Sequence, residues 1–293
     1  KRGINMKYKV FLLKDVAQSG KDYLKEHDCD VVIAASEDED EIIKQAQGCH
    51  GIFVRNENVT ARMMDGIPTL KVIAKHGVGY DNIDIEAATK RNIQVVYAPL
   101  GNVNSVAEHA LLLLLACARK YTIASDELKS GNYAIRFSLS GAHEIKGKTL
   151  GLLGYGHIAK CFAKKAKNGL EMNVISYTRS SKPGINEDGV EMVENRDDLF
   201  KRADYLSIHV PSTPETRHSI GMREFMLMKK GACIINTARG NIINEAELVE
   251  ALNKGIIAGA GLDVLEKEPV DKDNPLLKME QVVVTPHIAG MTP

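Results

Sequence analysis

The stretch Leu150-Gly151-Leu152-Leu153-Gly154-Tyr155-Gly156-His157-Ile158-Ala159 decides the fold. An apolar run of strand length leads into a Gly-x-Gly-x-x-Ala loop, and residues 159–168 continue as a helix. In such a unit the first glycine permits the tight turn, the second lets a pyrophosphate approach the backbone, and the helix N-terminus attracts negative charge. The stretch predicts a dinucleotide site at Gly154, Tyr155, Gly156, His157 and Ile158; a plain glycine turn is the alternative.

The next predicted strand, residues 173–177, ends without the acidic side chain that would accept the adenosine ribose hydroxyls. Thr178, Arg179 and Ser180 stand there instead. A guanidinium and hydroxyl groups can all donate hydrogen bonds to a 2′-phosphate. We therefore expect these three residues to contact the cofactor and NADP to be preferred over NAD. The alternative is that Arg179 is a solvated turn residue.

Strand-like and helix-like segments alternate on both sides of this stretch. The strand-like runs are residues 10–13, 31–34, 52–55, 72–75 and 93–97, and then 150–153, 173–177, 205–210, 232–236, 258–262 and 282–285. This alternation predicts an α/β fold with two Rossmann-like, doubly wound parallel-sheet domains and the active site in the cleft between them. Ser105 and Glu108 have capping-box spacing, so we expect a long helix to begin there and to mark the domain joint.

Composition favours two domains and a small-molecule partner. The chain has 293 residues, 44% of them hydrophobic, which is long for one domain. Lys plus Arg and Asp plus Glu balance at 38 each, so no field of one sign would recruit nucleic acid or an anionic membrane. The apolar run 110–118 is far short of the roughly 20 residues that cross a bilayer. Five scattered cysteines suit free thiols in a reducing compartment, and we expect the cytoplasm.

Residues of the types that chemistry at a carbonyl group needs come after the later predicted strands. Arg239 could hold a carboxylate through two parallel hydrogen bonds while polarising the neighbouring carbonyl; a surface salt bridge is its alternative. His287 is a candidate acid/base, although a lone histidine there is more often structural. A carboxylate hydrogen-bonded to an imidazole raises its proton affinity and fixes its orientation. Glu268 lies 19 residues earlier, Glu266 competes for this role, and spacing alone does not choose between them.

A second glycine loop follows a strand in the first half of the chain, at Lys75-His76-Gly77-Val78-Gly79-Tyr80. Backbone N–H groups in such a loop can bind a small carboxylate without a side chain in the way. A tight turn with no ligand would be the interpretation if this loop stood alone.

Taken together, these residues resemble the D-isomer-specific 2-hydroxyacid dehydrogenase family, and the resemblance spans nearly the whole chain. The motifs that occur in family order are Ser105-Val106-Ala107-Glu108, the Gly154 loop, His209-Val210-Pro211, Asn236-Thr237-Ala238-Arg239-Gly240, Asp263-Val264 with Glu268-Pro269, and Thr285-Pro286-His287. The combination is far more specific than any one of its parts.

The resemblance implies a role for each matching residue. Arg239 would be the substrate-binding and polarising arginine, His287 the acid/base, and Glu268, rather than Glu266, its carboxylate partner. Asp263 would hold the nicotinamide amide. Further cofactor contacts are implied at His209, Val210, Pro211, Thr237 and Ala238, and further substrate contacts at Arg55, Val78 and Gly79. None of these roles calls for a metal ion.

The resemblance also implies domain roles. Residues 6–100 would form a flavodoxin-like substrate-binding domain, completed by the C-terminal segment from about residue 288, and residues 101–287 a Rossmann domain for NAD(P). Family members usually continue with a helix that returns to the first domain. Because this chain stops at Pro293, we expect either a truncated chain or a tail that is not ordered. A homodimer formed through the region of the Ser105 helix is likewise implied.

The resulting hypothesis is a reductase of small 2-oxo acids that runs reversibly against D-2-hydroxy acids of the glyoxylate, hydroxypyruvate or 3-phosphoglycerate type. Hydride would move between the nicotinamide and C2 while His287 handles the proton on the substrate oxygen. Two alternatives remain, a dinucleotide-sensing corepressor-like scaffold and a dehydrogenase of the formate or phosphite type, since a fold does not fix a function.

Overall fold

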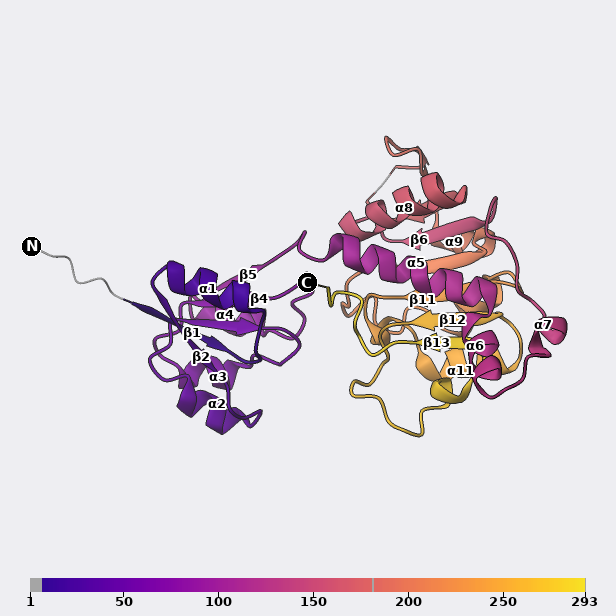
Figure 1. Ribbon diagram of the computed structural model, residues 1–293. Helices are drawn as coiled ribbons and strands as arrows, with labels where there is room; N and C mark the ends of the chain where they lie inside the picture. Colours follow the sequence, from indigo (N-terminus) through magenta and orange to yellow (C-terminus); the bar gives the residue numbers. More distant parts are fainter. Residues whose placement is uncertain (1–6, 181, 293) are drawn as a thin grey trace, which may run out of the picture. The chain divides into compact units, whose positions relative to one another are not determined.

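The computed structural model describes residues 7–180 and 182–292 (Figure 1). The chain divides into two compact units. The first ends at Asn102, and the second comprises Val103–Thr292. The division falls just ahead of the helix that was expected to mark the domain joint.

The first unit is a parallel sheet with helices between its strands. Its elements are β1 (Tyr8–Leu12), α1 (Gln18–Glu26), β2 (Cys29–Ile33), α2 (Glu39–Gln45), β3 (Gly51–Val54), α3 (Ala61–Gly66), β4 (Val72–Lys75), α4 (Ile85–Lys90) and β5 (Gln94–Tyr97). The strand order is β2-β1-β3-β4-β5, and every neighbouring pair is parallel. This is the flavodoxin-like order, in which the crevice for a ligand lies beyond the carboxyl ends of the strands.

Side chains from successive strands and helices build the core of the first unit. Phe11, Ile52 and Ile73 are fully buried, one on each of three adjacent strands. Helix starts are fixed locally, because the Thr60 hydroxyl accepts from the Met63 amide at α3 and the Asp84 carboxylate accepts from the Ala87 amide at α4.

The second unit carries the larger sheet. Its elements are α5 (Val103–Arg119), α6 (Tyr121–Lys129), α7 (Ile135–Ser138), β6 (Thr149–Leu153), α8 (His157–Leu170), β7 (Asn173–Tyr177), β8 (Gly184–Ile185), β9 (Glu191–Met192), α9 (Arg196–Arg202), β10 (Tyr205–Ile208), α10 (Met222–Leu227), β11 (Cys233–Asn236), η1 (Gly240–Ile242), α11 (Glu245–Asn253), β12 (Gly259–Leu262), η2 (Pro275–Lys278) and β13 (Val282–Val284). The strand order is β13-β12-β11-β10-β6-β7-β9-β8, and only the β8–β9 pair is antiparallel among the described residues. The order reverses between β6 and β10, which is the switch point where a Rossmann sheet binds its ligand.

Helices cover both faces of this sheet, because its central strands are apolar on both sides. In β10, Tyr205 joins the core formed with α5 and α8, while Leu206 joins the core formed with α9, α10 and α11. In β11, Ile235 belongs to the core with α5 and α8, and Ile234 to the core with α9, α10 and α11. Near-continuous apolar strands with helices on either side are typical of a doubly wound sheet.

These observations confirm the predicted α/β class with two Rossmann-like parallel sheets. The predicted capping box is wrong. Helix α5 begins at Val103, and Ser105 lies inside it with its hydroxyl donating to the Ala289 carbonyl at 2.6 Å. Ser105 therefore fastens a distant segment instead of capping the helix.

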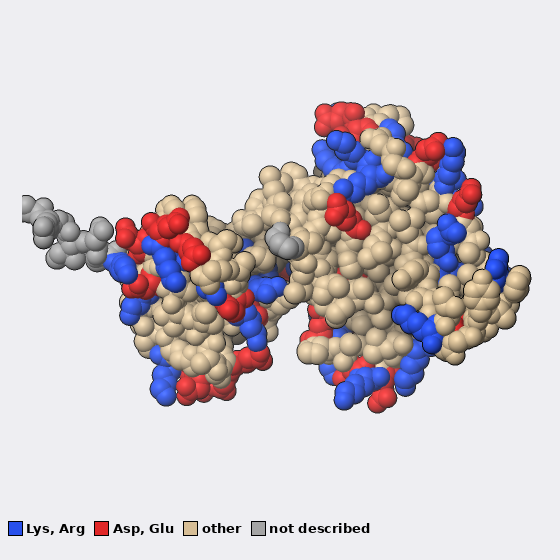
Figure 2. All heavy atoms as spheres, viewed as in Figure 1, with Lys and Arg blue, Asp and Glu red and all other residues tan. Residues whose placement is uncertain are grey.

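Side chains of both charges lie on the surface. On the face shown in Figure 2, Lys and Arg side chains are interspersed with Asp and Glu on each unit. No helix in residues 7–180 and 182–292 is long and apolar enough to span a bilayer.

Candidate active site and dinucleotide loop

The glycine loop runs from the carboxyl end of β6 to the first turn of α8. Gly154 has φ +96°, and a Cβ there would lie 2.5 Å from the His209 carbonyl oxygen, so no other residue fits. A Cβ on Gly156, by contrast, would meet nothing within 4 Å. Gly156 thus leaves open space at the N-terminus of a 14-residue helix, where a pyrophosphate would be attracted. This open cradle fits a dinucleotide.

Side chains after β10 and β11 border the same end of the sheet. His209 forms a 2.9 Å hydrogen bond with the Ser207 hydroxyl, and burial lowers the pKa of His209 to about 4, so the ring is neutral. The Asn236 side chain holds the turn that follows β11, since it accepts from the Ala238 amide and donates to the Arg239 carbonyl. The buried Thr237 hydroxyl has no hydrogen-bond partner among the described residues. A bound polar ligand could satisfy it.

Glu268 and His287 lie in direct contact. Glu268 Oε2 is 2.7 Å from His287 Nδ1, and Glu268 Oε1 accepts from the Leu265 amide at 3.2 Å. Burial acts to raise the pKa of Glu268, but His287, the Leu265 amide and the charge of Arg239 together outweigh it, so the pKa of Glu268 falls below its ordinary value. Glu268 is therefore an ionised partner for the imidazole at neutral pH, and the ring presents its other nitrogen, Nε2, for chemistry.

The segment that carries His287 is fixed by a buried carboxylate. Asp263 is 1% exposed and accepts hydrogen bonds from the Thr285 hydroxyl at 2.6 Å and from the Ile288 and Ala289 amides at 2.9 Å each. His287 itself has φ +54°, and its amide donates to the Asp263 carbonyl. Because the carboxylate satisfies three donors around this tight turn, it orients the imidazole.

Helix α5 also supports this segment. His109 Nε2 lies 2.8 Å from the Thr285 hydroxyl, and the Ser105 hydroxyl donates to the Ala289 carbonyl. No sequence pattern indicates a role for His109 or Thr285, because only the fold brings residues so far apart in the chain into contact. The predicted contact of Asp263 with the nicotinamide stays a prediction.

Arg239 lies close to this pair. Its charge contributes to the low pKa of Glu268, and its Nη1 donates to the Ala238 carbonyl at 2.7 Å. A Cβ on Gly240 would fall 2.0 Å from the Leu265 carbonyl carbon, so the backbone after Arg239 packs directly on the loop that carries Glu268. The second unit therefore brings Arg239, Glu268 and His287 together.

The competing carboxylate, Glu266, faces a different histidine. Its Oε1 lies 2.6 Å from His218 Nε2. The choice that spacing left open is thus decided by geometry, since Glu268 is the one in contact with His287.

The predicted substrate contacts of the first unit follow β3 and β4. The Arg55 carbonyl accepts from the Lys75 amine and, at 3.3 Å, from the side-chain Nδ2 of Asn82. Gly77 has φ +119° at the start of the loop that contains Val78 and Gly79. The roles of Arg55, Val78 and Gly79 stay predictions.

Comparison with known proteins identifies the family. The sequence profile "D-isomer specific 2-hydroxyacid dehydrogenase, NAD binding domain" matches residues 111–289. The chain belongs to the D-isomer specific 2-hydroxyacid dehydrogenase family. The family resemblance in the sequence is thereby confirmed, and the second unit contains the NAD binding domain of that family.

Individual relatives cover the chain to different extents. A D-3-phosphoglycerate dehydrogenase of Archaeoglobus fulgidus is 42% identical over 97% of this chain but 54% of its own length, so the chain spans about half of that relative. A glyoxylate reductase of Thermococcus gammatolerans is 35% identical over 98% of this chain and 88% of its own. An NADPH-dependent glyoxylate/hydroxypyruvate reductase from Sinorhizobium meliloti, solved with NADP and malonate, superposes with a TM-score of 0.85 at 28% identity, covering 98% of this chain and 88% of that one.

Proposed function

We propose that this protein is an NAD(P)-dependent dehydrogenase that interconverts small 2-oxo acids and D-2-hydroxy acids. The observation that carries the proposal is the 2.7 Å contact between Glu268 and His287, made beside Arg239 in the second unit. An ionised carboxylate that orients an imidazole, next to a guanidinium, suits reversible proton transfer at a substrate oxygen.

Each residue has a separate task in this proposal. His287 Nε2 donates a proton to the carbonyl oxygen in reduction and accepts it in oxidation, while Glu268 stabilises the imidazolium. Arg239 binds the substrate carboxylate and polarises the neighbouring carbonyl. Arg55, Val78 and Gly79 are the proposed substrate-binding residues of the first unit. The nicotinamide, when bound, supplies or accepts the hydride.

The cofactor would be held by the loop from Gly154 to Ile158, by Thr178, Arg179 and Ser180 after β7, and by the segments at 209–211 and 237–238. The open space at Gly156 and the unpartnered Thr237 hydroxyl support this placement. The absence of a carboxylate at position 178 supports a preference for NADP, as does the NADP in the reductase from Sinorhizobium meliloti.

Glyoxylate, hydroxypyruvate and 3-phosphohydroxypyruvate are the candidate substrates, because both glyoxylate reductases and D-3-phosphoglycerate dehydrogenases are relatives of this chain. The test is a panel of oxo acids, including 3-phosphohydroxypyruvate and pyruvate, followed by nicotinamide absorbance with NADH and with NADPH. Running the panel with D-2-hydroxy acids and formate tests the oxidative direction. A protein that binds the dinucleotide but turns over no member of either panel would contradict the proposal and favour a sensing scaffold.

The cofactor preference has its own variant. Thr178→Asp should raise kcat/KM for NADH relative to NADPH at least about tenfold, because the carboxylate would accept from the ribose hydroxyls and repel a 2′-phosphate, and a hydrogen bond to a charged group contributes about 1.5–3 kcal/mol. Thr178→Asn is the matched neutral control. A wild-type protein that already prefers NADH would contradict the NADP assignment.

A homodimer and a cytoplasmic location complete the proposal. Helices α6 and α7 and the residues between them leave large apolar side chains exposed, at Tyr121, Leu128, Tyr133 and Phe137, of which Phe137 is 82% exposed. A second copy of the chain would cover them. Sedimentation velocity should give the mass of two chains for the wild type and a shift toward the mass of one chain for Phe137→Asp.

The state of the cysteines supports the proposed cytoplasmic location. All five cysteines are free, as expected in a reducing compartment.

A further inference from the structure

The loop after β12 carries two glutamates, and each contacts a different histidine. Glu268 contacts His287, and Glu266 contacts His218. The second contact joins Glu266 Oε1 to His218 Nε2 at 2.6 Å. The side chains of His218 and Glu266 are about one-third exposed. The need to satisfy polar groups buried in the core therefore does not account for their contact.

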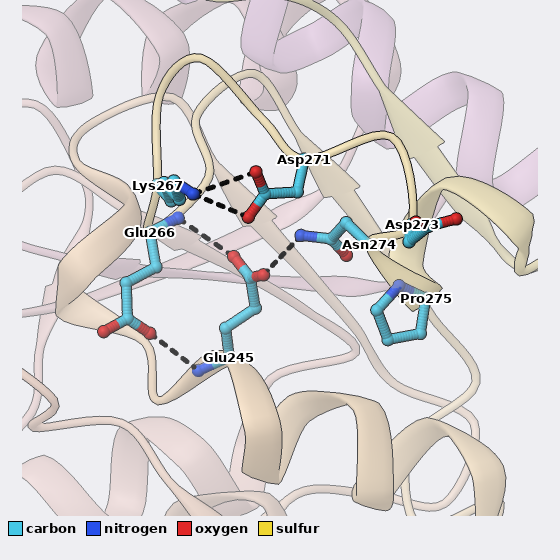
Figure 3. Close-up of a pocket in the computed structure, with 7 residues that line it drawn as sticks. All are labelled: Glu245, Glu266, Lys267, Asp271, Asp273, Asn274 and Pro275. Atoms are coloured by element: carbon cyan, nitrogen blue, oxygen red, sulfur yellow. Dashed lines mark hydrogen bonds and ion pairs between the residues drawn. The ribbon is translucent and has the colours of Figure 1, made fainter.

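Glu266 is also bound to the first residue of α11. The Glu266 amide donates to Glu245 Oε2 at 2.9 Å, and the Glu245 amide donates to Glu266 Oε2 at 3.4 Å (Figure 3). The other oxygen of Glu245 accepts from Asn274 at 2.6 Å. Glu245, Glu266 and Asn274 line a pocket together with Lys267, Asp271, Asp273 and Pro275, so four of its seven lining residues are acidic. We call His218, Glu245 and Glu266 the Glu266 clamp.

The clamp connects to the segment that carries Arg239. His218 has φ +47°, a conformation that favours glycine and asparagine, and its amide donates to the Asn241 carbonyl at 2.8 Å. Gly240 packs directly on the backbone of Leu265. His218 is thus fixed to the 239–242 segment while its ring holds Glu266, so one imidazole joins the loop of Arg239 to the loop of Glu268.

We propose that His218 and Glu266 are positioning residues that hold Glu268 against His287. Residues 263–274 form no helix or strand, so hydrogen bonds of their own must fix the loop's path. The clamp holds the backbone two residues before Glu268. The Leu265 amide that donates to Glu268 Oε1 belongs to the peptide unit directly before the one that packs on Gly240. Without the clamp, the Glu268 carboxylate would lose its alignment with the imidazole. This inference rests on the proposed function.

Replacing His218 with glutamine or with asparagine tests its contact with Glu266 separately from the residue's other features. The glutamine side-chain nitrogen can reach the place of His Nε2, whereas that of asparagine reaches only the place of Nδ1. Since Nε2 makes the contact with Glu266, His218→Gln keeps the contact and His218→Asn loses it. Lys267→Gln, which removes the exposed Lys267–Asp271 pair from the same loop, is the matched control.

His218→Asn is expected to lower kcat roughly tenfold, with the order of 10²-fold as the upper limit for a misplacement of about 1 Å. The His218→Asn variant is expected to keep the wild-type Tm and the wild-type Kd for the dinucleotide. His218→Gln and Lys267→Gln should stay close to the wild type. In a Glu268→Gln background, His218→Asn should cost nothing more, because its effect passes through Glu268. Equal losses for the two His218 variants, or additive losses with Glu268→Gln, would overturn the proposal.

Amide hydrogen exchange tests the clamp without turnover. The Leu265 and Glu266 amides, which donate to Glu268 and Glu245, should exchange faster in His218→Asn than in His218→Gln. Unchanged protection in His218→Asn would show that the clamp does not hold the loop. If the wild type reduces no oxo acid, the proposed function fails, while the exchange comparison still decides whether His218 positions Glu268.

Discussion

Replacing His287 with glutamine is expected to lower kcat by roughly 10²- to 10⁴-fold, the loss that follows removal of a general acid/base. Nδ1 of the ring is taken by Glu268, so Nε2 is the nitrogen that would exchange a proton with the substrate oxygen. Glutamine offers no group that gains and loses a proton near neutral pH. Steady-state kinetics with the best substrate of the panel measure this loss.

Two further variants show whether the loss is chemical. His287→Asn can keep a donor toward Glu268 and tolerates the φ of +54° at this position, so it should fold like the wild type and yet lose the same activity. His27→Gln, an exposed histidine at the end of α1 in the first unit, should change nothing. Dinucleotide Kd should stay near the wild-type value throughout. Near-normal turnover in His287→Gln would remove His287 from the mechanism.

The sequence predicts the framework of the second unit well because its signals are local. A glycine loop between an apolar run and a helix needs only neighbouring residues to be identified, and the structure has a strand, the left-handed Gly154 and α8 in that order. The alternation of strands and helices likewise predicts both parallel sheets. The short pair β8–β9 and the helices α6 and α7 lacked comparably strong patterns and were not predicted.

The contacts within the site depend on the fold and are beyond pattern analysis. Glu266 and Glu268 differ by two positions and have equal reach, so only the path of the loop assigns one to His218 and the other to His287. The support that His109 gives to Thr285 joins residues 176 positions apart. A pattern can propose residue types for a reaction, but their hydrogen-bond partners follow from tertiary packing.

Replacing Arg239 with lysine is expected to lower kcat/KM by roughly 10²-fold, the order found for loss of one electrostatic donor at a reacting centre. Lysine keeps the charge but cannot present two parallel N–H groups to a carboxylate, so KM should rise and kcat should fall together. Arg202→Lys is the matched control, because it makes the same change in the two-point contact with Glu191, at helix α9.

The two parts of this effect have separate origins. KM reports the hold on the substrate carboxylate, while kcat reports polarisation of the carbonyl and the field that Arg239 exerts on Glu268, whose pKa it helps to lower. Lysine at position 239 keeps part of that field, so Glu268 should remain ionised and the His287 contact should persist. Loss of activity in Arg239→Lys with unchanged Leu265 amide protection would then assign the defect to substrate binding and polarisation. Unaltered kinetics would make Arg239 a structural residue.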